Sequence, residues 1–337
     1  MAMWKFSGVV ILLMLMVSCV GSRQEEMYLG SPAQNYYEQG YEFSQQRQYQ
    51  QALAAYREAV NLAPENPLYL SGLGGIYKLL ARYDLALKYN QQALLLYQQW
   101  YGDDSEKAAI VLNNIAGILT SMGELDQAIE YFKQTEVLFT QIYGKEHASI
   151  ATVWNNMASV FRKKGDLQGA KNYFERALQL KLVLLGDTHP SVATAWNNLG
   201  GTLADLGQYH KAIEYYTKAL VIRRALMEDQ HPSIAVTLNN IGNAWIELGD
   251  AQTAISYFRQ ALDSDLATFG DQHPTVAIRL NNLGQAFGVL GQYALAQSYY
   301  DQALAILNHN FSDEHRHVVM VKQNIDALKA RKLRSSI

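Results

Sequence analysis

Residues 193–219 read ATAWNNLGGTLADLGQYHKAIEYYTKA, and they hold two amphipathic segments on either side of a turn. In the first segment, large apolar residues return at spacings of three and four, at Trp196, Leu199 and Leu203. After the glycine of the turn, the second segment continues with small and aromatic residues at the same spacings, at Ala212, Tyr216 and Ala219. Such spacings place side chains on one face of an α-helix. The stretch therefore predicts two helices that pack closely against each other.

The same frame returns along most of the chain. Aligned on the alanine that follows the turn, it recurs at Ala52, Ala86, Ala128, Ala170, Ala212, Ala254 and Ala296. The first step is 34 residues and every later step is 42, so the repeats begin at residues 33, 67, 109, 151, 193, 235 and 277. A fixed period of this size is the signature of a solenoid, whose ends need capping. An apolar and basic segment from about residue 319 to 333 predicts a C-terminal capping helix.

These residues resemble the tetratricopeptide repeat, whose pattern is W-x2-L-G-x2-Y followed by A-x3-F and a proline. The first repeat, residues 33–66, matches that pattern at Tyr36, Gly40, Phe43, Ala52, Tyr56, Ala59 and Pro64. The later repeats carry eight more residues and a G-D-x-H-P junction, which resembles the 42-residue subtype of the kinesin light chain family. The resemblance implies an all-α, right-handed α-solenoid of helix-turn-helix repeats over residues 33–333.

Composition limits the class of partner. The formal net charge of -3 gives no basic footprint for nucleic acid, and 49% apolar content is ample for a core. Cys19 is the one cysteine, so neither a disulfide within the chain nor a cysteine-based metal cluster is expected. We therefore expect no nucleic-acid partner.

The N-terminus has the pattern of a targeting segment. Residues 9–17 are wholly apolar, which is too short to span a bilayer but suits a signal peptide over residues 1–18. Residues 15–19, LMVSC, resemble a bacterial lipobox, which implies a lipid on Cys19 and a tether over residues 19–32. By resemblance to bacterial sorting rules, Val20 favours the outer membrane. We expect an outer-membrane lipoprotein that faces the periplasm; the alternative is a secreted or periplasmic chain without an anchor.

The search for catalytic and metal-binding residues gives no site. HExxH, GxSxG and phosphate-loop spacings are absent, so we expect no enzymatic activity, cofactor or small-molecule substrate. Histidines return every 42 residues, at His147, His189, His231, His273 and His315. Neighbouring helices lie about 8–10 Å apart, which is too far for side chains one repeat apart to share a zinc ion. The middle three precede proline, a residue favoured at the first position of a helix, so the row predicts helix starts.

Asparagine pairs recur in the first helix of five repeats, at residues 113–114, 155–156, 197–198, 239–240 and 281–282. Asparagine costs up to about 0.7 kcal/mol relative to alanine in a helix, so an offsetting interaction is expected. On a helical wheel the first asparagine leans toward the neighbouring repeat and the second points away from the core.

In tetratricopeptide solenoids the first helices line a concave surface that binds extended peptides, and the resemblance implies this role here. The second asparagines match a ligand-contact position, at Asn114, Asn156, Asn198, Asn240 and Asn282. Their companions on the wheel include Asn243 and Gln285, and Lys163 adds a local positive charge. Each carboxamide offers a donor and an acceptor to a peptide backbone. The alternative is that the amides bond only to each other and to neighbouring helices.

The resulting hypothesis is a non-enzymatic scaffold or adaptor that binds an extended segment of another protein and touches the membrane through its lipid anchor alone. A structural or self-assembling spacer, which would use its convex face or its ends, is the alternative. A regulatory subunit of an enzyme is the least favoured of the three.

Overall fold

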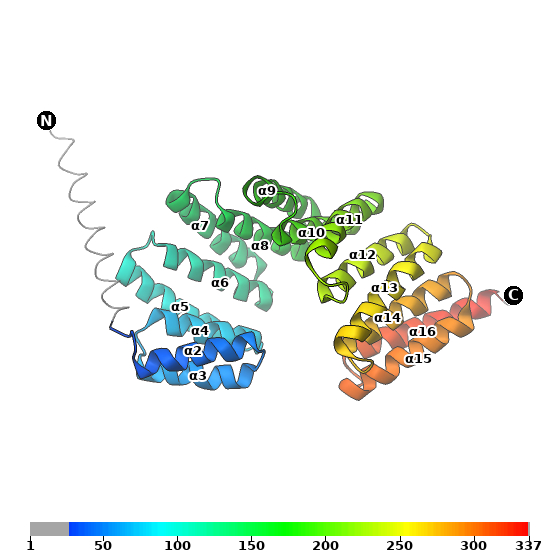
Figure 1. Cartoon of the computed structure of the whole chain (residues 1–337), viewed down its shortest axis with the longest axis horizontal. Coiled ribbons are helices and arrows are strands. Elements are labelled where there is room, and N and C mark those ends of the chain that lie inside the picture. The colour runs from blue at the N-terminus through cyan, green and yellow to red at the C-terminus, as the bar shows by residue number, and fades with distance from the viewer. Residues whose placement is uncertain (1–26, 336–337) are drawn as a thin grey trace. The chain divides into compact units, whose positions relative to one another are not determined.

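The computed structural model describes residues 27–335, which form fifteen α-helices and no strand (Figure 1). This confirms the all-α class. The predicted signal peptide and Cys19 lie outside the described residues. Within residues 27–335, no helix combines the length and apolar character needed to cross a lipid bilayer.

The helices follow one another as antiparallel pairs. The first four pairs are α2 (Pro32–Gln45) and α3 (Tyr49–Leu62), α4 (Pro67–Leu79) and α5 (Tyr83–Tyr101), α6 (Glu106–Met122) and α7 (Leu125–Tyr143), and α8 (Ala148–Lys164) and α9 (Leu167–Leu185). The next three are α10 (Pro190–Asp205) and α11 (Tyr209–Leu226), α12 (Pro232–Glu247) and α13 (Ala251–Phe269), and α14 (Pro274–Val289) and α15 (Tyr293–Asn310). The last helix, α16 (Arg316–Ser335), has no partner of its own repeat.

The chain divides into two compact units, an N-terminal unit of residues 1–180 and a C-terminal unit of residues 181–337. In the N-terminal unit, residues from α4 to α9 share one core cluster that includes Ile115, Phe132 and Met157. In the C-terminal unit, residues of α13 to α16 share another that includes Phe258 and Leu283. Each unit is thus held together by contacts between neighbouring helices, as expected of a solenoid.

The histidine row marks helix starts, as predicted. His189 is the N-cap of α10, and its Nδ1 accepts a hydrogen bond from the backbone N–H of Ser191 at 3.1 Å. The same bond forms at every other member of the row, at His147, His231, His273 and His315. An N-cap satisfies one of the backbone donors that a helix start leaves open. His147 and His315 make this bond without a following proline.

Glycine in the first helix of several repeats makes room for an aromatic ring of the second. A Cβ atom on Gly242 would lie 2.5 Å from Cε1 of Phe258, and one on Gly200 would lie 2.8 Å from Cδ1 of Tyr216. Both rings are buried. The close approach predicted from small residues is therefore confirmed in these two pairs.

The capping helix is present, and it begins earlier than expected. α16 starts at Arg316 rather than near residue 319, because His315 caps it one helix turn before the apolar frame begins. Its apolar side is buried in the C-terminal unit, at Val318, Val321, Ile325 and Leu328. Its basic residues are exposed, at Lys329, Arg331, Lys332 and Arg334.

Candidate binding face

The asparagine pairs form a ladder of side-chain hydrogen bonds between repeats. In the N-terminal unit, Nδ2 of Asn156 donates to Oδ1 of Asn113 at 3.2 Å. The C-terminal unit has three such bonds, from Asn240 to Asn197 at 3.4 Å, from Asn282 to Asn239 at 2.7 Å and from Asn324 to Asn281 at 2.8 Å. In the first three bonds the second asparagine of one repeat donates to the first asparagine of the repeat before it, and Asn324, which follows Gln323, takes the donor position in the fourth. The last donor, Asn324, lies in α16 and was not predicted.

The ladder explains why the chain tolerates asparagine in these helices. Asn239 and Asn281 are only 8% and 2% exposed, so an unpaired amide there would carry a desolvation cost. A bond across the repeat boundary offsets both that cost and the helix penalty. For the four pairs above, the side chains therefore do what the alternative interpretation expected, and they bond to each other. Binding of a peptide by the same residues stays a prediction.

The predicted site residues fall into two groups by exposure. The five second asparagines are half-buried: Asn114, Asn156, Asn198, Asn240 and Asn282. Their predicted companions Asn243, Gln285 and Lys163 are exposed. Asn243 lies on α12 and Gln285 on α14, and neither side chain makes a hydrogen bond within residues 27–335. Lys163, at the end of α8, donates to the backbone oxygen of Thr120 at 3.4 Å.

A half-buried cation on α4 was missed by the sequence analysis. A Cβ atom on Gly117 would lie 2.8 Å from Nζ of Lys78, which therefore reaches across from α4 to α6. Burial lowers the pKa of Lys78, and no carboxylate of the described residues pairs with it. Glycine at position 117 leaves room for the ammonium group. The pattern of a single repeat does not show this contact, because Lys78 and Gly117 belong to neighbouring repeats.

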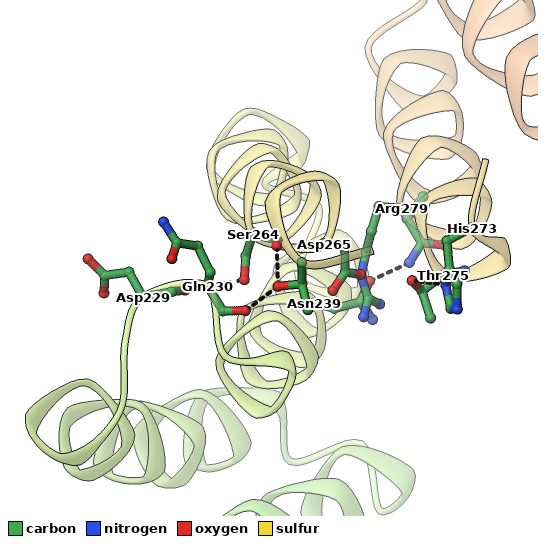
Figure 2. Close-up of polar contacts among 10 residues, drawn as sticks. Asp229, Gln230, Asn239, Ser264, Asp265, His273, Thr275 and Arg279 are labelled. Atoms are coloured by element: carbon green, nitrogen blue, oxygen red, sulfur yellow. Dashed lines mark hydrogen bonds and ion pairs between the residues drawn. The ribbon is translucent and has the colours of Figure 1, made fainter. Parts of the chain in front are cut away.

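A buried ion pair in the C-terminal unit was also missed. Nε of Arg279 lies 2.9 Å from Oδ2 of Asp265, and the two side chains are 8% and 2% exposed (Figure 2). Burial raises the pKa of Asp265, and this effect outweighs the opposing attraction of Arg279 and of His273. One feature of the sequence could have indicated the pair: Arg279 stands at a position that is valine in other repeats, such as Val153 and Val321.

Surface pockets occur away from the ladder. One of about 550 Å³ lies between α7 and the end of α8, one of about 460 Å³ lies between α2 and α3, and one of about 590 Å³ lies between α11 and α13. Nowhere in the described part of the chain do three potential metal-binding side chains gather at one point. The geometry thus offers exposed faces of helices, which suit a macromolecular partner.

Several solved structures share the fold. BtubC (BKLC) from P. vanneervenii has a TM-score of 0.56 and 23% identity, and the match covers 66% of this chain and 91% of that one. Repeats of a putative kinesin light chain from Podosopora anserina have a TM-score of 0.52 and 22% identity, with 58% and 92% covered. PilW, a type IV pilus biogenesis factor, has a TM-score of 0.53 and 22% identity, with 70% and 93% covered. At these identities the likeness is one of fold.

Sequence profiles give the family. No curated protein sequence matches this chain. A profile described as tetratricopeptide repeat matches residues 67–141, 108–182, 149–225, 191–267 and 233–309, and a second profile with the same description matches residues 33–66. Such repeats are generally scaffolds for protein–protein interaction rather than catalysts. Since these matches span most of the sequence, the chain belongs to the tetratricopeptide repeat family.

Proposed function

We propose that this chain is a non-enzymatic scaffold that binds an extended segment of another protein along the first helices of its repeats. The observation that carries the proposal is the exposure of Asn243 and Gln285, which occupy equivalent positions one repeat apart and whose side chains make no hydrogen bond to any described residue. They lie one helical turn after Asn239 and Asn281, whose ladder bonds hold α12, α14 and α16 in register.

The spacing of these amides suits a peptide backbone. An extended chain advances about 3.3 Å per residue, so first helices about 10 Å apart meet roughly every third residue. At each meeting point a carboxamide can donate to a carbonyl or accept from an N–H. Because the ladder already uses Nδ2 of Asn240 and Asn282, the exposed Asn243 and Gln285 are the better contacts in this unit.

Site-specific crosslinking in native membranes tests the proposal. A photoreactive residue at position 243 or 285 is expected to trap a partner, and the same residue at Val221 is expected not to. Val221 is 63% exposed and lies on α11, a second helix, so it controls for exposure alone. Asn243→Ala with Gln285→Ala should reduce capture while leaving helicity unchanged. Equal capture from all three positions would contradict a binding face on the first helices.

A structural spacer is the second candidate, and the ladder favours it. Four pairs of asparagines are already bonded to each other, which is enough to explain their presence. A spacer would make its contacts through second helices or ends. Crosslinking from Val221 with none from positions 243 and 285 would support this function.

We propose that Cys19 carries a lipid that holds the chain on the periplasmic side of a bacterial outer membrane. The support is the sequence LMVSC at residues 15–19. Cys19→Ala is expected to move the chain from the detergent phase to the aqueous phase on phase separation, and globomycin is expected to block maturation. Normal processing in the presence of globomycin would favour the alternative, a secreted or periplasmic chain without an anchor.

A further inference from the structure

Charge is distributed unevenly along this chain. Residues 316–337 contain six basic residues and one acidic residue, so this segment carries a formal charge of +5. Because the whole chain carries -3, residues 1–315 together carry -8. An asymmetry of this kind is typical of a chain whose basic part contacts an anionic partner.

The basic residues of α16 are concentrated where the helix has left the core. Up to residue 334, Leu328 is the last buried residue of this helix, and each residue from 329 to 334 is exposed. Six residues cover more than one full turn of an α-helix, so this segment is exposed on every side. We call residues 329–334 the basic end of α16. It contains no acidic residue and four of the six basic residues, namely Lys329, Arg331, Lys332 and Arg334.

Ion pairs within the chain do not neutralise this segment. Nζ of Lys329 lies 3.5 Å from Oδ1 of Asp326, but the two side chains are 64% and 77% exposed, so water screens their attraction. Asp326 is also the last acidic residue of the sequence. Within residues 27–335, Arg331 and Arg334 take part in no ion pair. The basic end of α16 therefore presents a net positive charge to the solvent.

An exposed leucine distinguishes a lipid surface from other anionic partners. Leu333 lies within the basic end and is 69% exposed, and no large apolar side chain of residues 27–335 is more exposed. The phosphates of a nucleic acid offer this side chain no apolar environment. The boundary between headgroups and acyl chains of a membrane does offer one, and basic residues interleaved with leucine are typical of segments that bind there.

The length of the basic end also suits contact with a membrane. At a rise of 1.5 Å per residue, its six residues extend about 9 Å. This is close to the Debye length of about 8 Å at physiological ionic strength. When α16 meets the membrane end-on, its cations reach the headgroups, while repulsion between the lipids and the acidic remainder of the chain is largely screened.

We propose that the basic end of α16 binds the headgroups of anionic phospholipids, with its cations on the phosphates and Leu333 in the boundary region of the bilayer. This contact is additional to the lipid proposed on Cys19, and it departs from the expectation that the lipid anchor is the only contact with the membrane. It holds the C-terminal unit at the membrane surface. It depends neither on the lipid nor on the binding of a peptide by the first helices.

Sedimentation with lipid vesicles tests the proposal on the full-length Cys19→Ala chain, to which no acyl chain is attached. This chain is expected to bind vesicles of phosphatidylcholine with about one third phosphatidylglycerol, and not vesicles of phosphatidylcholine alone. Replacing Arg331, Lys332 and Arg334 with glutamine should weaken binding roughly 100-fold, since each cation near an anionic surface contributes a factor of about five. Equal binding to both kinds of vesicle, or unchanged binding by the triple variant, would overturn the proposal.

The matched control removes the same charge from α11. Lys211, Lys218 and Arg224 are exposed cations of that second helix, and their replacement with glutamine should change vesicle binding by less than about two-fold, because they lie outside the contact. Circular dichroism should show the same helicity in both triple variants, which change exposed side chains only. An equal loss of binding in the two variants would assign it to net charge and would overturn the proposal.

Leu333→Gln separates a lipid surface from other polyanions. It keeps every charge and should weaken vesicle binding several-fold, because one apolar side chain no longer enters the boundary region. Unchanged vesicle binding by this variant would overturn the choice of a lipid surface. Binding of a short DNA duplex by the Cys19→Ala chain, without binding to the anionic vesicles, would assign the basic end to nucleic acid and would also overturn it.

Discussion

The amide of Asn282 connects two repeats through one hydrogen bond, to Oδ1 of Asn239. Asn282→Ala leaves that oxygen buried without its donor and also removes the acceptor of Nδ2 of Asn281, so we expect the free energy of unfolding to fall by about 1–2 kcal/mol, less the small gain in helix propensity. Asn243 is exposed and its side chain makes no hydrogen bond, so Asn243→Ala brings only the gain in helix propensity. It should change the free energy of unfolding by less than about 0.5 kcal/mol. Urea denaturation measures both changes, as shifts of the unfolding midpoint at an unchanged slope of free energy against urea concentration. Equal effects would show that the ladder bond contributes nothing.

Asp265 gives the C-terminal unit a defined pH dependence. Burial raises its pKa in the folded chain above the ordinary value of 3.8, so between pH 3.8 and the folded pKa the folded state binds more protons than the unfolded state does. The contribution of this carboxyl to stability is thus complete below about pH 3.8 and is lost as pH rises through the folded pKa. Asp265→Asn removes that titration. The wild-type minus variant difference in unfolding free energy should therefore decrease with rising pH; an increase would reverse the assigned direction.

At the residue scale, the sequence predicted the asparagine row, and it offered bonding between the amides only as the alternative to peptide binding. The helical wheel placed Asn197 toward its neighbour, and Asn197 does accept from Asn240 of the next repeat. That Asn240 supplies the donor depends on the rotation between repeats, which a wheel for one helix does not contain. The ion pair of Asp265 and Arg279 was missed because the pattern of a single helix does not show which side chains meet across a repeat boundary.

At the scale of the element, two glycines of first helices have opposite surroundings. Gly242 faces Phe258, and a Cβ atom there would come within 2.5 Å of the ring, whereas one on Gly75 of α4 would meet nothing within 4 Å. We expect Gly242→Ala to destabilise by about 1–3 kcal/mol through overpacking. Gly75→Ala should stabilise by up to about 1 kcal/mol through helix propensity. Thermal unfolding of the two variants measures both, and loss of stability in both would contradict the packing argument.

The helix boundaries show that apolar periodicity alone places the start of a first helix a few residues too late. The apolar frame puts a repeat start at residue 193, yet α10 begins at Pro190, where His189 caps it. The first turn of such a helix carries few core residues, so the frame omits it. The same omission explains why the capping helix was placed near residue 319 although α16 begins at Arg316. The histidine–proline junction located the starts correctly, because capping is a local interaction that residue type alone can reveal.

At the scale of the whole molecule, α16 closes the C-terminal unit. Deletion of residues 316–337 uncovers apolar surface of α14 and α15, including the side chains that pack on Val318 and Leu328. We expect a fall in Tm of several degrees and concentration-dependent association, since each 1 kcal/mol shifts Tm by about 2–4 °C in a domain of this size. Scanning calorimetry and size-exclusion chromatography provide the measurements.

A chain that ends at Ala330 is the control for this deletion. It keeps the buried side of α16, and the residues with a described exposure that it loses, 331–334, are all exposed. Its Tm should match that of the full chain within about 2 °C, in line with the small effect of surface changes. A similar loss of stability in both truncated chains would assign the effect to the basic residues rather than to the covered apolar surface.

The ladder also gives the C-terminal unit a polarity. Its three rungs, from Asn240, Asn282 and Asn324, all donate toward the preceding repeat. The amide dipoles of successive rungs therefore share one sense and reinforce one another instead of alternating. As a result, the two directions along the row of first helices are electrically inequivalent. A peptide laid on them in the N-to-C sense meets a different field from one laid in reverse, so the scaffold itself carries information about orientation.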